Sequence, residues 1–253
     1  MKLKFTILFA LVFAMTFAWI TFTDNHHTTS GTTVSKQTEK NAGDSLYVYL
    51  HFRETMEAKI KAGKTKTSLR EIPKSLQQAV LATEDRRFYE HGAVDPIGIL
   101  RALATNLQSG KTVEGGSSIS QQVVKNMLLS QEQTVTRKAQ ELILAILLER
   151  NYTKDQILEM YFNTAYFGAN ATGIAEACHT YYGKAPSDLS LGQASLLAGL
   201  LQAPTYYNPL VNYNAAKDRQ RIVLAGMTEE GYITKKEAVA AYAETLHLQK
   251  NTK

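Results

Sequence analysis

Helix-start signals recur along this chain and constrain its fold more than any other feature. A serine or threonine stands three residues before a glutamine or glutamate in Thr153–Gln156, Ser190–Gln193 and Thr234–Glu237. In this arrangement, the capping box, each side chain of the pair accepts a hydrogen bond from a backbone N–H at the start of a helix. From Pro73 onward, apolar residues also recur with helical spacing. The pattern predicts a mainly α-helical body.

The three signals open helices of different predicted length. The first helix carries Ile157–Phe167, and Gly168 can end it. The second helix runs to Pro204, and the third runs toward Leu246. Leu46–Phe52 (LYVYLHF) alternates instead, which predicts a short strand near the start of the folded body.

A pair of carboxylates, Glu84 and Asp85, closes an apolar helical run, Leu76–Ala82. A carboxylate at the end of an apolar helix is partly desolvated, which tends to raise its pKa and suits it to act as an acid or a base. Phe88 and His91 follow at helical spacing. Taken alone, the pair favours a solvent-exposed helix end, because carboxylates with a perturbed pKa are a minority.

A glycine pair, Gly115–Gly116, lets the backbone turn sharply before the next predicted helix. Ser117 or Ser118 can cap that helix, whose body is predicted as Ile119–Leu128. The turn and the cap together place the polar residues that follow beside a helix N-terminus.

One face of this helix is polar. Ser118, Gln122 and Lys125 follow an i, i+4, i+7 spacing and therefore share that face, and Asn126 is adjacent. Hydroxyl, amide and ammonium groups beside a helix N-terminus suit an anionic or sugar-phosphate ligand. The alternative is a flexible glycine loop followed by an ordinary amphipathic helix.

The next predicted helix begins near Arg137 and has a wide apolar stripe between Leu142 and Leu147. Arg137 and Glu141 form an i, i+4 pair on one face, with Lys138 beside them. One interpretation is a surface ion pair, which adds little stability. The other is a second carboxylate, Glu141, held beside cations that bind a leaving phosphate.

The N-terminus contains an uncharged run, Phe5–Thr23, that is about long enough to cross a bilayer as a helix. Lys2 and Lys4 precede it, so the positive-inside rule places the N-terminus in the cytoplasm and the rest of the chain outside. A cleaved signal peptide is the competing interpretation, but the run is long for one and lacks a clear cleavage site. The predicted parts are a single-pass transmembrane anchor at 1–23, a flexible linker at 24–44 and one folded domain at 45–250.

Residues 95–114 contain an amphipathic segment. It begins at Asp95-Pro96, a pair of residues that interrupts the preceding helical pattern. Its apolar residues are Ile97, Ile99, Leu100, Leu103 and Leu107. A segment with exposed apolar residues and few charges can lie in a membrane interface. A core helix fits the pattern equally well.

Composition limits the partners and the chemistry. The chain has 28 basic and 23 acidic residues and a formal charge of +5, which suits an anionic membrane surface or a phosphate-bearing substrate. No nucleic-acid-binding module is recognisable, so no nucleic-acid partner is expected. The sequence has no D-x-D, H-E-x-x-H or S-x-x-K motif. The single cysteine, Cys178, is predicted to be a buried apolar side chain.

Five blocks occur in order along the chain. They read EDRRFYEH at Glu84–His91, EGGSSISQQVVKN at Glu114–Asn126, RKAQE at Arg137–Glu141, ILEMYFNTAYFG at Ile157–Gly168 and ASLLAGLLQAP at Ala194–Pro204. Their order and spacing resemble the peptidoglycan glycosyltransferases, glycosyltransferase family 51. The pattern departs from this family at Ala93, where the family often has glycine, and this could alter the local turn.

The resemblance implies a fold and a location. The expected fold is a lysozyme-like helical domain with a larger globular lobe and a smaller membrane-proximal lobe, in which residues 95–114 are mobile and contact the membrane. The expected activity is polymerisation of peptidoglycan glycan chains at the outer face of a bacterial cell membrane. The implied partners are lipid II, the growing glycan chain, the membrane and other proteins of cell-wall synthesis.

The resemblance also implies roles for single residues. Glu84 would be the general base, and Glu141 would position the cations that neutralise a pyrophosphate leaving group or assist its departure. The implied substrate-binding or positioning residues are Asp85, Phe88, His91, Ser118, Gln122, Lys125, Asn126, Arg137 and Lys138. A divalent cation, Mg²⁺ or Mn²⁺, could share the neutralisation, although the sequence shows no ligands for it. Tyr161, Asn163 and Gly168 of the fourth block are interpreted as mainly structural.

Two other classes of function fit parts of the pattern. A lysozyme-like enzyme could use one glutamate to cleave glycans, and a membrane scaffold of the cell-wall machinery would need no catalytic group. Lys125 and Arg137 argue against the first class, because cleaving a bond between two sugars needs no pyrophosphate site. The presence of Glu84, Lys125 and Glu141 argues against the second.

Overall fold

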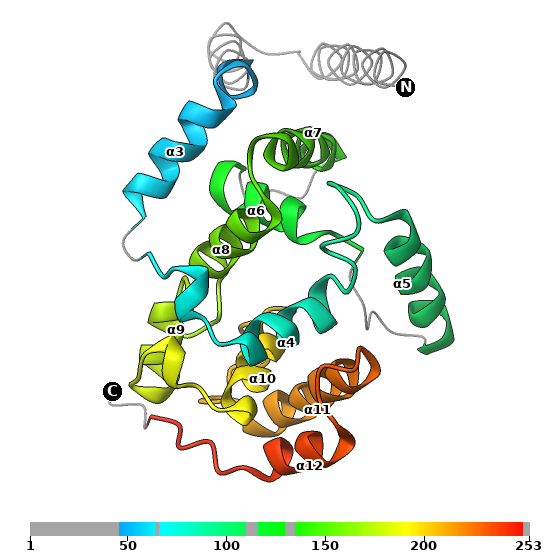
Figure 1. Ribbon diagram of the computed structural model, residues 1–253, viewed down its shortest axis with the longest axis vertical. Coiled ribbons are helices and arrows are strands. Elements are labelled where there is room, and N and C mark those ends of the chain that lie inside the picture. The colour runs from blue at the N-terminus through cyan, green and yellow to red at the C-terminus, as the bar shows by residue number, and fades with distance from the viewer. Residues whose placement is uncertain (1–45, 64–65, 110–115, 130–134, 250–253) are drawn as a thin grey trace, which may run out of the picture.

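Helices make up almost all of the regular structure of the residues described below. The computed structural model describes residues 46–63, 66–109, 116–129 and 135–249. Within these residues the only strand-like pairing is one isolated antiparallel bridge, between Tyr166 and Thr172. The predicted mainly α-helical fold is therefore confirmed (Figure 1).

The described residues form a series of helices along the chain. Their bounds are α3 (Phe52–Ala62), η1 (Leu69–Glu71), α4 (Lys74–Glu84), α5 (Pro96–Ser109), α6 (Ile119–Leu128), α7 (Val135–Asn151), α8 (Lys154–Thr164), α9 (Ile174–Tyr182), η2 (Pro186–Asp188), α10 (Leu191–Leu200), α11 (Tyr213–Glu229) and α12 (Lys235–Ala243).

The strand predicted for Leu46–Phe52 is wrong. Residues 46–50 are helical and lead into α3. Tyr47 and His51 stack one helical turn apart, with ring centroids separated by 4.4 Å, and Phe52 and Met56 are buried at the same spacing. The alternating pattern has no neighbouring strand in the described structure, so helical contacts decide the conformation.

All three predicted capping boxes are present, at the starts of α8, α10 and α12. In each, the hydroxyl accepts a hydrogen bond from the backbone N–H three residues on, and the glutamine or glutamate accepts one from the capping residue. Another box, formed by Ser118 and Gln121, opens α6, whose bounds match the predicted helix.

Helix ends differ from the predictions. α8 ends at Thr164, because the chain then enters the turn closed by the bridge between Tyr166 and Thr172. Gly168 does not end the helix but lies within that turn, with φ of +86°. α10 and α12 also end a few residues before the predicted Pro204 and Leu246. Local caps predict helix starts well, whereas these ends depend on tertiary turns.

α10 is the central helix of one group of packed helices. Residues 192–200 are all buried, and α4, α11 and α12 pack against the helix. A helix that is apolar on all sides is stable only when neighbours cover it. α6, α7 and α8 form a second group, and α4 lies on the side of the first group that faces it (Figure 1). Cys178 in α9 is fully buried, and burial raises the pKa of its thiol to about 12, which confirms its prediction as a core residue.

α5 stands at the side of the helical body (Figure 1). Its five predicted apolar residues are exposed by 41% to 75%: Ile97, Ile99, Leu100, Leu103 and Leu107. Ala102, on another face, is buried. The core-helix interpretation is therefore wrong for this apolar face. Contact with a membrane remains a prediction, as does the division into two lobes.

Among the described residues, no helix has the length and apolar character needed to cross a membrane. The predicted anchor at 1–23 and the predicted linker at 24–44 lie outside these residues, as does part of the segment 95–114. The domain boundaries therefore remain predictions.

Candidate active site

Glu84 is the last residue of α4 and is partly buried. Burial raises the pKa of its carboxyl, while a hydrogen bond from Gln122 and the positive charges of Arg219 and Lys125 act to lower it. The net shift is upward, as predicted for a carboxylate at the end of an apolar helix. Such a shift brings a carboxylate closer to the pKa that suits a general base near neutral pH.

Gln122 connects Glu84 to α6. Its Nε2 donates a hydrogen bond to Glu84 Oε2 at 2.9 Å. Its Oε1 accepts a longer hydrogen bond, at 3.4 Å, from the hydroxyl of Tyr161 on α8. The amide is therefore oriented by two neighbours from different helices, and it holds the carboxylate in one place.

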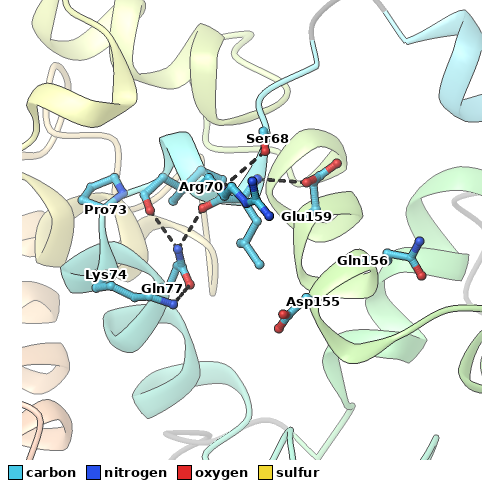
Figure 2. Close-up of a pocket in the computed structure, with 10 residues that line it drawn as sticks. Ser68, Arg70, Pro73, Lys74, Gln77, Asp155, Gln156 and Glu159 are labelled. Carbon is cyan, nitrogen blue, oxygen red and sulfur yellow. Dashed lines mark hydrogen bonds between the residues drawn. The ribbon is translucent and has the colours of Figure 1, made fainter.

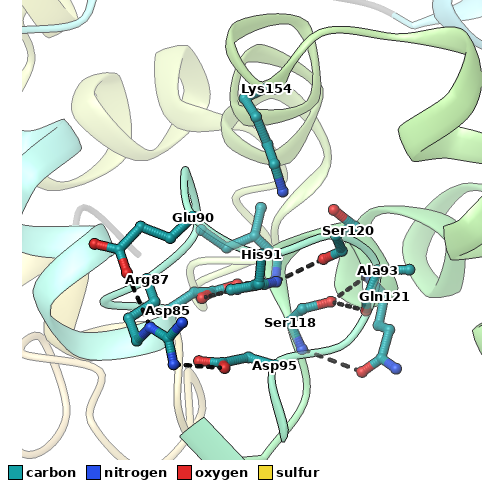
Figure 3. A network of polar contacts seen from close by, with 12 residues as sticks. Asp85, Arg87, Glu90, His91, Ala93, Asp95, Ser118, Ser120, Gln121 and Lys154 are labelled. Atoms are coloured by element: carbon teal, nitrogen blue, oxygen red, sulfur yellow. Dashed lines mark hydrogen bonds and ion pairs between the residues drawn. The ribbon is translucent and has the colours of Figure 1, made fainter. Parts of the chain in front are cut away.

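Asp85 ties the end of α4 to the start of α6 (Figure 3). One carboxylate oxygen accepts a hydrogen bond from the backbone N–H of Ile119 at 3.0 Å, and the other lies 2.6 Å from His91 Nε2. His91 Nδ1 lies 2.5 Å from the carbonyl oxygen of Gly92. The structure thus brings Asp85 and His91 together beside Glu84, where they hold the turn after α4 against α6.

Ser118 lies at the N-terminus of α6 and is buried. Its hydroxyl donates to the carbonyl oxygen of Ala93 at 2.8 Å and accepts from the backbone N–H of Gln121. Ser118 and Glu84 also line the same narrow pocket, between the end of α4, α5 and the start of α6. Since the hydroxyl is already engaged within the protein, its contact with substrate remains a prediction.

A larger cavity of about 640 Å³ adjoins Gln122. Gln122, Lys125 and Asn126 of α6 line it together with Tyr161 of α8. The segment after α8 and the turn after α10 complete the lining. Three of the predicted substrate-binding residues therefore share one cavity, and Gln122 links that cavity to Glu84.

The predicted cations of α7 gather around Glu141, which is only 2% exposed. Lys138 Nζ lies 2.5 Å from Glu141 Oε1, and an Arg137 guanidinium nitrogen lies 3.5 Å from Glu141 Oε2. Lys138 Nζ also donates to the hydroxyl of Ser117 at 2.9 Å. Ser117 lines the narrow pocket with Glu84, so this hydrogen bond connects α7 to the wall of that pocket.

Phe88 is fully buried in the turn after α4. The ammonium of Lys154 lies 4.4 Å from the centroid of its ring and pairs with Glu149 at 2.7 Å. An enclosed ring under a paired cation stabilises the turn. This position supports a positioning role for Phe88 rather than direct contact with a ligand.

The sequence pattern misses two residues of this region. Tyr161, interpreted from the sequence as structural, lines the cavity and contacts Gln122. Its place in the fourth block was the one feature of the sequence that indicated a place in the site. Arg219 of α11 is buried, and its positive charge acts to lower the pKa of Glu84. The sequence offered one indication that Arg219 is buried. It stands four and seven residues before Val223 and Gly226, so the three share one helix face, and the other two are also buried.

One group among the described residues has the spacing of a metal site: Asp85, His91 and Asp95, whose ligand atoms lie within 4.8 Å of one another. The protein already uses these atoms. Asp85 accepts from Ile119 and faces His91, and Asp95 pairs with Arg87 at 3.3 Å (Figure 3). The group fits a hydrogen-bond network better than a metal site.

A second cavity, of about 560 Å³, lies at the other end of α4, between η1 and the first turns of α8 (Figure 2). Its walls are tied by structural hydrogen bonds: Gln77 donates to the carbonyl oxygens of Leu69 and Ile72, and Glu159 accepts from the backbone of Leu69. It contains none of the predicted site residues, so the candidate active site is the region around Glu84.

A family model described as Transglycosylase matches residues 53–228. The chain belongs to the transglycosylase family. The match includes every residue of the site described above, and it confirms the family assignment made from the five blocks.

Relatives of this chain are considerably longer. It is 40% identical over 214 residues to penicillin-binding protein 1F of Bacillus subtilis (strain 168), covering 85% of this chain and 28% of that protein. It is 46% identical over 184 residues to penicillin-binding protein 1A of Neisseria flavescens, covering 73% of this chain and 23% of that protein. The chain thus spans about a quarter of the length of these relatives.

Among solved structures, the chain resembles penicillin-binding protein 1A from Haemophilus influenzae, with a TM-score of 0.43 and 22% sequence identity. The match covers 74% of this chain and 18% of that one.

Proposed function

We propose that this chain polymerises peptidoglycan glycan strands from lipid II, with Glu84 as the general base. The hydrogen bond from Gln122 to Glu84 at 2.9 Å is the observation that carries the proposal, because Gln122 also lines the cavity that contains Lys125. This arrangement suits a reaction in which a base and a cation act on opposite sides of the reactive carbon of a sugar. Membership of the transglycosylase family supports the same conclusion.

The reaction transfers the growing chain to a new unit. Glu84 takes the proton from the 4-hydroxyl of the GlcNAc of lipid II, and that oxygen forms a bond to C1 of the MurNAc at the end of the growing chain. The bond from C1 to the pyrophosphate oxygen breaks, and undecaprenyl pyrophosphate leaves with the electron pair. Attack opposite the leaving group inverts the anomeric centre.

The leaving pyrophosphate needs neutralisation of its negative charge more than it needs a proton. Lys125 in the cavity and Arg137 with Lys138 on α7 supply positive charge. Glu141 is buried between the two α7 cations, which suits it to orient them. Gln122 and Asn126 supply hydrogen-bonding groups for sugar or phosphate oxygens.

The substrate explains the proposed location. A lipid-linked substrate stays in the bilayer, so the site must stay at the membrane surface. We assign this task to a transmembrane anchor at 1–23 and to the exposed apolar face of α5. The N-terminus would then lie in the cytoplasm and the helical domain outside, beside other proteins of cell-wall synthesis.

Labelled lipid II tests the proposal directly. The full chain in membrane vesicles should convert it to a ladder of long glycan products, resolved on a gel. A lytic enzyme would instead shorten purified glycan strands and leave lipid II unchanged, and a scaffold would change neither. Either of these results would overturn the proposal. A chelator added to the same assay would show whether a divalent cation takes part.

A further inference from the structure

The second cavity, of about 560 Å³, has charges of opposite sign on its two walls. Arg70 of η1 and Lys74 of α4 line one wall, and Asp155 and Glu159 of α8 line the other (Figure 2). These four residues are all described, and no ion pair joins the two walls. Opposite charges that line one cavity without pairing can each bind a charged group of a ligand.

The hydrogen bonds that hold these walls leave the charged groups with unused bonding capacity. Glu159 Oε2 accepts from the backbone N–H of Leu69 at 2.9 Å, which ties α8 to η1. Asp155 Oδ1 accepts from the hydroxyl of Tyr89 at 2.9 Å. Lys74 Nζ donates to a side-chain amide of α4 at 3.2 Å. A carboxylate has two acceptor oxygens and an ammonium has three donors, so each group can bind a further partner.

The charges of the cavity indicate the chemistry of its ligand. Two cations and two carboxylates line it, so a ligand with charge of a single sign would be repelled by one of the walls. A ligand with a carboxylate at one end and an ammonium at the other matches both walls. The volume lies within the range of about 300–1,000 Å³ that is usual for ligand pockets. A short zwitterionic peptide has the required charges and size.

Both walls lead toward the candidate active site. Lys74 is the first residue of α4 and Glu84 is the last, so the helix runs about 15 Å from the cavity to the proposed base. Asp155 lies in the first turn of α8, and Tyr161 of the same helix lines the cavity beside Gln122. An extended peptide of five residues spans about 17 Å. A peptide attached to a sugar beside Glu84 can therefore reach the second cavity.

We propose that the second cavity binds the pentapeptide carried by lipid II and by the new glycan strand. The peptide carboxylate lies at Arg70 and Lys74, and its side-chain ammonium lies at Asp155 and Glu159. The proposal rests on the proposed function, because a peptidoglycan substrate is what brings such a peptide to the active site. The cavity then favours sugar units that carry a peptide over bare glycan.

Binding of a synthetic pentapeptide to the full chain tests this site without polymerisation. The probe has an acetylated N-terminus, lysine at its third position and a free C-terminal carboxylate. Two comparison peptides have either a C-terminal amide or an acetylated lysine. We expect saturable binding in isothermal titration calorimetry, with the Kd raised about five-fold by either modification, because each removes one of the two charges that the walls bind.

Two variants assign the ends of the peptide to the walls. In a chain with both Arg70→Met and Lys74→Met, the carboxylate and amide peptides should bind equally. In Asp155→Asn, acetylation of the lysine should raise the Kd less than about two-fold, because part of the ammonium site is gone. All three residues are exposed, so the variants should fold. The matched control, Lys236→Met, removes an exposed lysine of α12 and should keep the wild-type pattern.

Absence of saturable binding to the wild-type chain would overturn the proposal. An equal effect of amidation in the wild type and in the Arg70→Met, Lys74→Met chain would also overturn it. Lys125→Met should leave the Kd of the peptide unchanged, because Lys125 lines the other cavity. If this variant weakens binding as much as the double variant, the peptide does not bind specifically in the second cavity.

Failure of the proposed function gives a different result. A chain that binds the pentapeptide in the expected pattern but forms no polymer from lipid II contradicts only the proposed function. A chain that forms polymer but does not bind the pentapeptide contradicts only the peptide site.

Discussion

The side-chain amide of Gln122 holds two neighbours at once. Its nitrogen donates to Glu84 at 2.9 Å and its oxygen accepts from Tyr161 at 3.4 Å. The shorter bond involves a carboxylate, and hydrogen bonds to charged groups are worth about 1.5–3 kcal/mol. Most of the effect of this amide on the site should therefore pass through Glu84.

Replacing Gln122 with methionine keeps the size of the side chain and removes both bonds. We expect kcat to fall about ten- to a hundred-fold, because losing a hydrogen bond to the charged form raises the pKa of Glu84. The loss should be largest in the acidic range and shrink as pH rises. Tyr161→Phe removes only the longer bond and should lower kcat less than about three-fold. Equal losses of kcat in the two variants would contradict the claim that Gln122 acts mainly through Glu84.

Residues close together in the sequence blocks were predictable, and residues that reach the site by packing were not. Gln122 and Lys125 share a helix face that the spacing alone predicts. Ser118 also fits that spacing, yet its hydroxyl caps the helix and binds Ala93, which depends on the fold. Arg219 lies far along the chain, so its relation to Glu84 depends on how α11 packs on α4.

At the scale of the helix, the starts are determined by residues close together in the sequence, whereas the ends are not. A capping box needs only two residues three positions apart, and all three predicted boxes formed. The end of α8 depends instead on a turn that brings Gly168 close to the carbonyl oxygen of Pro204, 36 residues further along the chain, where a Cβ would lie at 2.5 Å. The strand predicted for Leu46–Phe52 failed for a similar reason, since a strand needs a partner.

Within the part of the chain that the structure describes, the exposed apolar face of α5 is the clearest case of a helix face that no neighbour covers. We predict that replacing Leu100 and Leu103 together with serine will weaken binding to anionic lipid vesicles about ten-fold or more, because each buried leucine contributes about 1.5–3 kcal/mol. The thermal melting temperature should change little, since both residues are exposed. Vesicle sedimentation measures the binding.

The control replaces two other exposed apolar residues, Ile222 and Val239, with serine. They lie on α11 and α12 rather than on α5. If this pair weakens vesicle binding as much as the α5 pair, apolar exposure in general, rather than α5, would explain the binding.

At the scale of the whole molecule, the candidate site lies where the two groups of helices meet. α4 packs on α10 and α11 and ends in Glu84, while α6 packs on α7 and α8 and presents Gln122 and Lys125. A site at such a junction requires the two groups of helices to keep a fixed relative position. Asp85 helps to fix it, because its carboxylate accepts a hydrogen bond from the first backbone N–H of α6.

Removing residues 1–23 tests the proposed anchor. The truncated chain should keep the melting temperature of the full chain, but it should turn over lipid II in vesicles more slowly. Turnover of detergent-dissolved lipid II should change less, because the substrate then no longer lies in a bilayer. Equal loss of stability and of turnover in both settings would argue against an anchor that serves only to place the site.

The decisive measurement combines rate and affinity for Glu84→Gln, with the exposed Glu90→Gln as the control. Loss of a general base should lower the polymerisation rate about 10²- to 10⁴-fold, while binding of lipid II stays within about two-fold of wild type. Glu90→Gln should match the wild-type chain in both. A Glu84→Gln chain that polymerises lipid II at a near-normal rate would contradict the account.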